Sequence, residues 1–418
     1  MPSTVPSACW RSGSFTGPEQ RTELKKSSKA GKPQKRYQDM KTRFQRTPLR
    51  RKARTLGVAV LIATAMTVLA ACGSGPGVQE SKAKEKITIF LAAPVNAPSF
   101  YPVLMPKAMG FYEDLGLDVT ILNVDGSPAG IQQLLAGRGD ALFGAASAIL
   151  AGFADGKPIE AVYEPSTQEL LTVLVPEESP IKKLEDLKGA LVGVRGPGAG
   201  EIAQHAAVLN SVGLTLGEDV KYVPVGSDVK VINQQLASGT ISAYLGVSVA
   251  AAESKIYLPA GTLREIPLPT SNGAAKPNSP IIFSKKMVKE KPQAVEAFLK
   301  AVVKGTIYAN ANPEGAAEAL AKMAPELAKD RAKFNQYVTN VLPVAAPPAG
   351  RSISSWDFGS MSEEGWQALM DESVSQSKFS GFAQPFSLEG YVNTSFIDKA
   401  NDFDKEAFAR EAKSLKAR

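Results

Sequence analysis

Short apolar runs alternate with longer amphipathic stretches from Lys86 onward, and this alternation predicts the secondary structure. Eight runs are short and apolar, as expected for buried strands: Ile87–Leu91, Val119–Leu122, Asp140–Ala145, Glu160–Tyr163, Leu171–Val175, Leu191–Val194, Tyr222–Val225 and Ile241–Leu245. The stretches between them are long enough for helices. This order predicts an α/β chain with mostly parallel sheets flanked by helices.

The clearest predicted helix lies between residues 295 and 307. Its apolar positions recur every three or four residues, with Lys and Glu on the opposite face: Val295, Phe298, Leu299, Val302, Val303, Thr306 and Ile307. Asn312 and Pro313 then predict a helix start, because Asn is a good cap and Pro suits the first turn. Shorter helices are expected near Glu363–Ser373 and Asp404–Leu415.

A short internal similarity recurs at an offset of 102 residues. Gln132, Gln133, Leu134, Gly137, Ala141 and Gly144 reappear as Gln234, Gln235, Leu236, Gly239, Ala243 and Gly246. Each copy predicts a helix, a glycine stop and a buried strand. The match indicates either two lobes of similar build or the same local chemistry reached independently.

The N-terminal segment has the layout of a secretory leader. Basic residues between Lys41 and Arg54 precede an uncharged run, Leu56–Ala71, which ends in Leu-Ala-Ala-Cys at Cys72. Its 16 residues fall short of the roughly 20 that a spanning helix needs. The motif resembles the bacterial lipoprotein box, which implies that Cys72 is lipidated and begins the mature chain; the alternative is a buried cysteine on an apolar helix.

Residues 1–71 are therefore expected to be a disordered basic extension plus a signal peptide, with Met40 as an alternative start. Residues 72–85 form a lipidated tether. The net charge of +7 belongs to this leader, because residues 1–71 hold 15 Lys and Arg against three acidic residues, while residues 72–418 hold 33 basic and 38 acidic residues. The charge thus gives no reason to expect a nucleic-acid partner.

Several segments also carry a family resemblance: Ala97–Pro102, Ala108–Val119, Leu135–Ala141, Leu184–Gly189, Lys291–Gln293 and Ala309–Glu314. With the leader and the α/β pattern, the chain resembles the substrate-binding proteins of ABC importers, in the group that serves sulfonates, nitrate, taurine, riboflavin and thiamine pyrimidine precursors. The resemblance spans roughly residues 86–401. It implies a two-lobed periplasmic-binding-protein type II fold with a hinge, and a monomer without a cofactor.

The same resemblance implies a small-molecule ligand held between the lobes and an ABC permease with its ATPase as partners, at the extracytoplasmic face of the cell membrane. By its pattern, residues 86–176 and 281–418 form lobe 1 and residues 177–280 form lobe 2. The crossings between the lobes are expected near Val175–Pro180 and Pro277–Ile282.

Ligands of open α/β sheets bind at the carboxyl ends of strands, beside helix N-termini, so three loops are candidates. The first offers hydrogen bonds and stacking from Asn96, Ser99, Phe100 and Tyr101, or else is a helix cap with core aromatics. The second places Ala146 and Ser147 at a helix start. The third is the glycine-rich turn with Arg195, Gly198, Ala199, Gly200 and Glu201; lesser candidates at strand ends and crossings are Tyr163 to Ser166, Tyr244, Gly246, Asn272 and Asn278.

Charge in the third loop favours an anionic ligand. Arg195 follows a buried strand and can hold a sulfonate or carboxylate with its guanidinium fork, whereas Glu201 can pair with Arg195 or meet a cationic amine. Glu201 also lies in the first helical turn, where the helix dipole already stabilises a carboxylate. The sequence therefore favours Arg195 as the ligand contact.

An enzyme is the rival class, and a scaffolding lipoprotein is the third. Both cysteines, Cys9 and Cys72, precede the expected folded body, so a cysteine nucleophile or a Cys-based metal site is excluded there. The thiamine-pyrimidine enzymes of the same group carry a cysteine-rich motif that this chain lacks. The single histidine, His205, lies within the predicted helix Ile202–Val212, where packing is favoured over chemistry.

Overall fold

The computed structural model describes residues 83–418, apart from 94–95, 167–170, 197–198, 200, 260, 269–275 and 349. Several predicted features lie outside these residues, namely the leader, the lipidation site Cys72, most of the tether, Gly198, Gly200 and Asn272.

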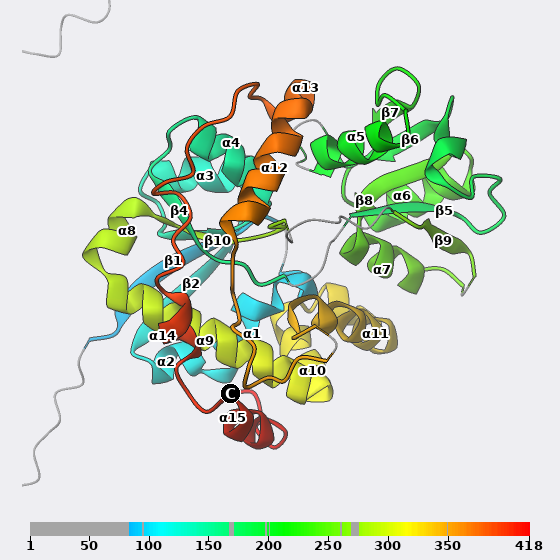
Figure 1. The fold of residues 1–418 in the computed structure, drawn as a ribbon. Coiled ribbons are helices and arrows are strands. Elements are labelled where there is room, and N and C mark those ends of the chain that lie inside the picture. Colours follow the sequence, from blue (N-terminus) through cyan, green and yellow to red (C-terminus); the bar gives the residue numbers. More distant parts are fainter. Residues whose placement is uncertain are drawn as a thin grey trace, which may run out of the picture. The chain divides into compact units, whose positions relative to one another are not determined.

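Two five-stranded sheets form the framework (Figure 1). The first has the order β2 (Leu117–Asn123), β1 (Glu85–Leu91), β3 (Ala141–Phe143), β10 (Ile281–Ser284), β4 (Ile159–Tyr163). The second has the order β7 (Lys221–Pro224), β6 (Leu191–Val194), β8 (Ala243–Val247), β5 (Leu171–Pro176), β9 (Leu263–Ile266). In each sheet four strands share one direction and the fourth strand in the order, β10 or β5, runs antiparallel to its neighbours. The predicted α/β class with mostly parallel, helix-flanked sheets is confirmed, although β9 and β10 were not among the predicted strands.

The chain crosses between the sheets twice. It leaves the first sheet after β4, enters the second with β5, and returns from β9 to β10, which inserts between β3 and β4. The expected lobe boundary at residue 177 is wrong in placing β5 with the first lobe, because β5 pairs with β8 and β9. An apolar run of this kind fits the centre of either sheet, so its sequence does not say which one it joins.

The internal repeat occupies equivalent places in the two sheets. Helix α3 (Ser127–Leu135) leads into β3, and α6 (Val229–Ala237) leads into β8; each strand is third in its sheet order. Gly137 and Gly239 follow the helices with φ values of 68° and 70°. This left-handed conformation is accessible to glycine at little cost, which accounts for its presence in both copies.

Two apolar layers cover the first sheet, following the two-residue period of its strands. Ile87, Ile89 and Leu91 of β1 face a core shared with α1 (Tyr101–Met109) and α9 (Pro292–Ala311). Phe90 faces the opposite core, which α3, α4 (Ala146–Ala154) and α12 (Glu363–Ser375) complete.

The predicted helices of this half are confirmed. All seven apolar positions assigned to the 295–307 stripe are buried in α9. Asn312 caps α10 (Pro313–Met323) by accepting a hydrogen bond from the backbone N–H of Gly315 at 3.0 Å. The short helices near residues 363 and 404 are α12 and α15 (Lys405–Ala412). The other helices around this sheet are α2 (Phe111–Asp114), α8 (Lys285–Glu290), α11 (Arg331–Val341), α13 (Ser377–Ser380) and α14 (Ile397–Asn401).

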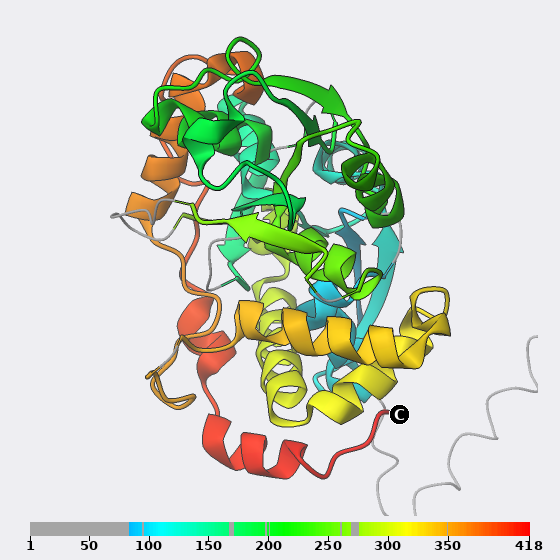
Figure 2. The same cartoon turned by 90° about the vertical axis from the view of Figure 1, so that its right-hand side faces the viewer.

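The second sheet is covered by α5 (Glu201–Ser211) on one face and by α6 and α7 (Ser248–Ile256) on the other. Helices of the two halves are in contact: α11 packs against α7, and α12 with α13 packs against α5. The orange α12 and α13 lie beside the green α5 in both views (Figures 1 and 2). Within the described part of the chain, no helix is long and apolar enough to span a membrane.

Candidate ligand-binding site

Arg195 and Glu201 form a bidentate pair where β6 ends and α5 begins. The guanidinium donates from Nε to Oε1 at 2.8 Å and from Nη2 to Oε2 at 2.5 Å. Burial alone lowers the pKa of Arg195, but the charge of Glu201 and its hydrogen bonds outweigh that effect and raise it. The side chain of Glu201 is only 4% exposed while that of Arg195 is 39% exposed, so only the cation of the pair is open to a solute.

Tyr244 and His205 surround this pair from the neighbouring strand and helix. Tyr244 lies on β8, which is hydrogen-bonded to β6, and its ring is buried. Burial raises the pKa of Tyr244, and the charge of Glu201 adds to the rise. His205 on α5 is buried and donates from Nε2 to the carbonyl of Gly246 at 2.9 Å; burial lowers its pKa, which keeps the ring neutral. The expected packing role of His205 agrees with this contact.

Gly246 is required by the ring of Tyr244. A Cβ atom at residue 246 would lie 2.1 Å from Cε1 of Tyr244, a distance that non-bonded atoms do not reach. The glycine thus lets Tyr244 fold over the end of its own strand. Ala199 of the glycine-rich turn is half-buried and packs on the core beside α5.

The first loop divides into residues that face the core and residues that remain accessible. Tyr101 is 1% exposed, donates to the carbonyl of Leu342 at 2.7 Å and accepts from Nδ2 of Asn310 at 3.3 Å. Its hydroxyl is committed inside the lobe, and burial raises its pKa far above the usual range. The prediction that Tyr101 contacts ligand is not supported, because the first turn of α1 directs this ring into the core.

The other three residues of that loop are half-buried. Phe100 stacks edge-on against Phe143, with ring centroids 4.9 Å apart. Asn96 donates from Nδ2 to the carbonyl of Met323 at 3.2 Å, whereas its buried Oδ1 has no hydrogen-bond partner. Ser99 belongs to the short 3-10 turn η1 (Pro98–Phe100) and is hydrogen-bonded to Tyr337.

Three backbone N–H groups in the turn that leads into α4 have partners. Gly144 donates to the carbonyl of Pro280 at 3.3 Å, Ala145 to Oγ of Ser127 at 2.8 Å, and Ala146 to the carbonyl of Asn278 at 2.9 Å. Ala146 is buried and Ser147 half-buried. The turn into α4 therefore holds the returning chain, and Ser147 stays a candidate contact there.

Glu164 binds the two crossings to each other. It follows β4, is 6% exposed, and accepts hydrogen bonds from the backbone N–H groups of Ser166, Asn278 and Ser279. Burial raises the pKa of Glu164 to about 7, although these three donors act to lower it. The sequence included Glu164 only within a range of lesser candidates, and nothing in its local pattern distinguished it.

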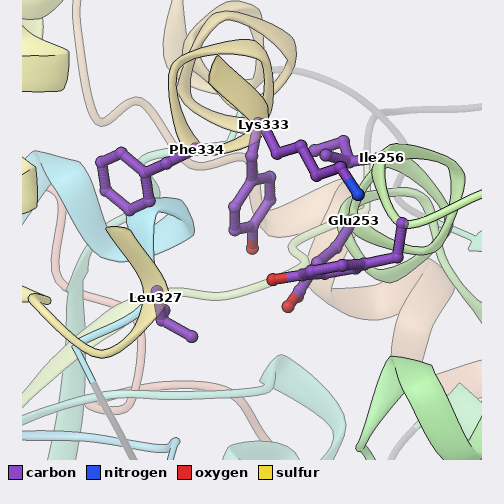
Figure 3. A pocket seen from close by; sticks show the side chains of 7 residues that line it. Glu253, Ile256, Leu327, Lys333 and Phe334 are labelled. Carbon is purple, nitrogen blue, oxygen red and sulfur yellow. The ribbon is translucent and has the colours of Figure 1, made fainter. Parts of the chain in front are cut away.

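Figure 3 shows the contact between α7 and α11, which the sequence did not predict. Tyr337 of α11 is buried, accepts a hydrogen bond from Ser99 and donates one to the carboxylate of Glu253 on α7. Burial raises the pKa of Glu253, and the nearby Asp228 adds to the rise. Lys333 lies 5.6 Å from the ring centre of Tyr257 in the same contact. The cavity between these side chains has about 10 Å³ of free volume, which suits a water molecule and not an organic ligand.

The structure thus groups Arg195, Glu201 and Tyr244 at one strand edge, and links Ser99 to α7 through Tyr337. No group of three or more His, Cys, Asp or Glu side chains able to hold a metal ion occurs among residues that the structure describes.

Residues 97–316, just over half of the chain, match the family model described as NMT1/THI5 like. The chain belongs to the NMT1/THI5-like family. This NMT1/THI5-like chain is 28% identical over 255 residues to a putative thiamine biosynthesis protein of Haemophilus influenzae; the match covers 59% of this chain and 76% of that protein.

Solved structures share the NMT1/THI5-like chain's fold. The periplasmic aliphatic sulphonate binding protein SsuA of Escherichia coli matches with a TM-score of 0.56 and 17% identity, over 73% of this chain and 94% of that one. The alkanesulfonate-binding protein SsuA of Xanthomonas axonopodis pv. citri, bound to MOPS, matches with a TM-score of 0.53 and 16% identity, over 71% and 94%. These structural matches show a shared two-lobed α/β fold, which confirms the expected architecture. At identities this low, the likeness extends to the fold alone.

Proposed function

We propose that this protein is the extracytoplasmic solute-binding lipoprotein of an ABC importer. It captures a small ligand of the sulfonate, nitrate, taurine or thiamine-pyrimidine-precursor class between its lobes and delivers it to a membrane permease and its ATPase. The observation that carries the proposal is the double crossing, in which two sheets of the same strand order are joined by the β4–β5 and β9–β10 segments. Two connections of this kind permit hinge closure around a ligand.

The strand pairings support a revised division into lobes. Lobe 1 comprises the strands up to Tyr163 and the chain from Ile281 onward, and lobe 2 comprises Leu171 to Ile266. The ligand lies between the carboxyl ends of the two sets of parallel strands, as in other open α/β sheets. Candidate contacts are the accessible side chains at those ends, Asn96, Ser99, Phe100, Ser147, Ser166 and Arg195.

Arg195 is the residue that selects the ligand's charge. Glu201 holds its guanidinium from the buried side through two hydrogen bonds. The exposed part of the fork can then donate to a sulfonate, nitrate or carboxylate oxygen, a charge-assisted hydrogen bond that is stronger than a neutral one. An anionic group on the ligand is the expectation.

The thiamine-related name of the Haemophilus relative favours a second ligand class, a thiamine pyrimidine precursor. Phe100 offers an aromatic face for such a planar ring, whereas Arg195 gives it no strong advantage. If the protein is instead a thiamine-pyrimidine-related enzyme, it should convert the bound pyrimidine into a product.

Thermal-shift and calorimetric screening with nitrate, taurine, ethanesulfonate and a hydroxymethylpyrimidine tests the proposal. A true ligand at a hundredfold excess over its Kd stabilises the protein by about 2.7 kcal/mol, and X-ray scattering should show contraction on its addition. Binding without turnover supports the solute-binding role, and turnover of the pyrimidine supports the enzyme. Neither a shift nor a contraction across these compounds would favour a scaffolding lipoprotein instead.

A further inference from the structure

The carboxylate of Glu164 accepts hydrogen bonds from both crossings, with its two oxygens directed mainly at different ones. Oε1 accepts a hydrogen bond from the N–H of Ser166, in the segment that leaves the first sheet, at 2.9 Å. Oε2 accepts from Asn278 at 2.9 Å and from Ser279 at 3.2 Å, in the segment that returns to it, and the N–H of Ser279 also lies 3.5 Å from Oε1. A single side chain therefore holds together the two segments that connect the sheets.

We propose that Glu164 is a positioning residue of the hinge, a clip whose ionised form fixes the two crossings together and whose protonation releases one of them. Its effect on ligand capture rests on the proposed function; the clip itself does not. The chemistry is that of the carboxyl group: an ionised carboxylate accepts hydrogen bonds on both oxygens, whereas a neutral one carries a proton on one of them. That O–H faces a backbone N–H, so the strongest contact on the protonated oxygen, Ser166 on Oε1 or Asn278 on Oε2, must open.

The rest of the surroundings fix Glu164 in this place. Its own N–H donates to the carbonyl of Gly359 at 3.0 Å, and the carbonyl of Asn278 accepts from Ala146 of α4. The burial of the carboxyl group places its pKa at about 7. The clip therefore changes state within the physiological pH range.

Few charges face this carboxylate from the elements around it. On β4 the neighbour is the hydroxyl of Tyr163, a neutral group whose pKa burial raises further. On the returning crossing, Lys276 is paired with Glu372 of α12 at 2.6 Å. In the loop before Gly359, Asp357 is mostly exposed and lies 3.9 Å from Lys405. Glu164 is thus governed by burial and by backbone donors, and not by an ion pair of its own.

Amide hydrogen exchange on the full, ligand-free chain tests the clip, with rates corrected for the intrinsic effect of pH. With a pKa of about 7, the protonated fraction rises about tenfold between pH 8 and pH 6. Exchange in the peptide covering residues 276–284 should accelerate by up to that factor, while exchange in β8, residues 243–247, should not change. In Glu164→Gln the amide can accept on only one oxygen, so exchange should be fast at every pH.

The matched control is Glu160→Gln, on the strand β4 that precedes Glu164; among the residues that the structure describes, its carboxylate accepts a hydrogen bond only from the side chain of Asn393, at 3.0 Å. Glu160→Gln should show the same acceleration of exchange between pH 8 and pH 6 as the wild-type protein. Should Glu164→Gln fail to fold, the wild-type profile alone decides, together with a ¹³C titration that locates one side-chain carboxyl near pH 7. The clip is overturned if exchange in residues 276–284 of the wild-type protein does not change with pH. It is also overturned if Glu164→Gln still shows the acceleration between pH 8 and pH 6. Because no ligand is present, this outcome is separate from failure of the ligand screen.

Discussion

The guanidinium of Arg195 and the carboxylate of Glu201 are bound to each other, Nε to Oε1 at 2.8 Å and Nη2 to Oε2 at 2.5 Å. The sequence presented these residues as competing ligand contacts of opposite charge. Their difference in exposure assigns them different positions: Glu201 is enclosed by the protein and holds Arg195, whereas Arg195 is partly open. A ligand contact is therefore expected from Arg195 alone.

Replacing Arg195 should weaken an anionic ligand. With ethanesulfonate as the probe, Arg195→Met is expected to lose about 1.5–3 kcal/mol of binding free energy, the range for a hydrogen bond to a charged group. Glu201→Gln should change the affinity little, because a glutamine oxygen still accepts from the guanidinium. Calorimetry measures both, with Arg138→Met as a control for charge, since Arg138 is exposed and bound to Gln133. A large loss in Glu201→Gln with Arg195→Met unchanged would indicate a cationic ligand.

Glu164 should make the stability of the protein depend on pH. Its folded-state pKa of about 7 lies above the ordinary value near 4.5, so the folded state holds the proton more tightly than the unfolded chain does. The resulting stability is fully present below about pH 4.5 and is lost as the pH rises through 7, a change of roughly 3 kcal/mol. Urea unfolding between pH 5 and pH 8 measures it. Glu164→Gln should flatten this part of the profile and Glu160→Gln should not; equal profiles in all three proteins would contradict the assignment.

Gly359 should not tolerate a side chain. Its φ of 87° is left-handed, and a Cβ atom there would lie 2.1 Å from Cδ2 and Cε2 of Tyr163. Gly359→Ala is expected to cost about 3–5 kcal/mol, because overpacking adds to backbone strain. Gly381 offers a matched control with a φ of 86° and no neighbour within 4 Å, so Gly381→Ala should cost only about 1–2 kcal/mol. Chemical denaturation compares them, and equal losses would mean that the contact with Tyr163 relaxes freely.

Removing the hydroxyl of Tyr337 should loosen the contact between α7 and α11. Tyr337→Phe leaves the half-buried carboxylate of Glu253 without this donor, so a loss of about 1.5–3 kcal/mol in unfolding free energy is expected. Tyr308→Phe is the control, because the Tyr308 hydroxyl makes only a long bond, 3.4 Å, to the carbonyl of Leu415. If the two variants lose the same free energy, the Tyr337 hydroxyl has no special role.

Cys72 should determine processing and membrane attachment. Cys72→Ser removes the thiol that the lipoprotein box requires, so the variant is expected to accumulate as an unprocessed precursor or to leave the lipid phase. Detergent-phase partition and the mass of the product measure this, with Cys9→Ser as the matched control. Mature-sized Cys72→Ser protein that remains in the membrane fraction would place the anchor elsewhere.

The local pattern of the sequence determined the elements and the fold class. The stripe from Val295 to Ile307 predicted α9 because helical geometry alone brings residues three and four apart onto one face. Asn312 predicted a helix start for an equally local reason, since a cap bonds to the N–H groups of the next turn. The recurrence of Gly137 as Gly239 likewise marked two equivalent helix ends before the arrangement of the sheets was known.

Tertiary structure decided which partners these elements and side chains meet. Strand β5 joins the second sheet through Tyr244 and its neighbours, which are about 70 residues away in the chain, so no local pattern assigns it. Tyr101 faces the core because α1 packs on α9, and Glu164 acquires donors at residues 278 and 279 only when the chain returns. Burial and long-range hydrogen bonds depend on neighbours that the local sequence does not name, and they set both the contacts and the pKa values of this site.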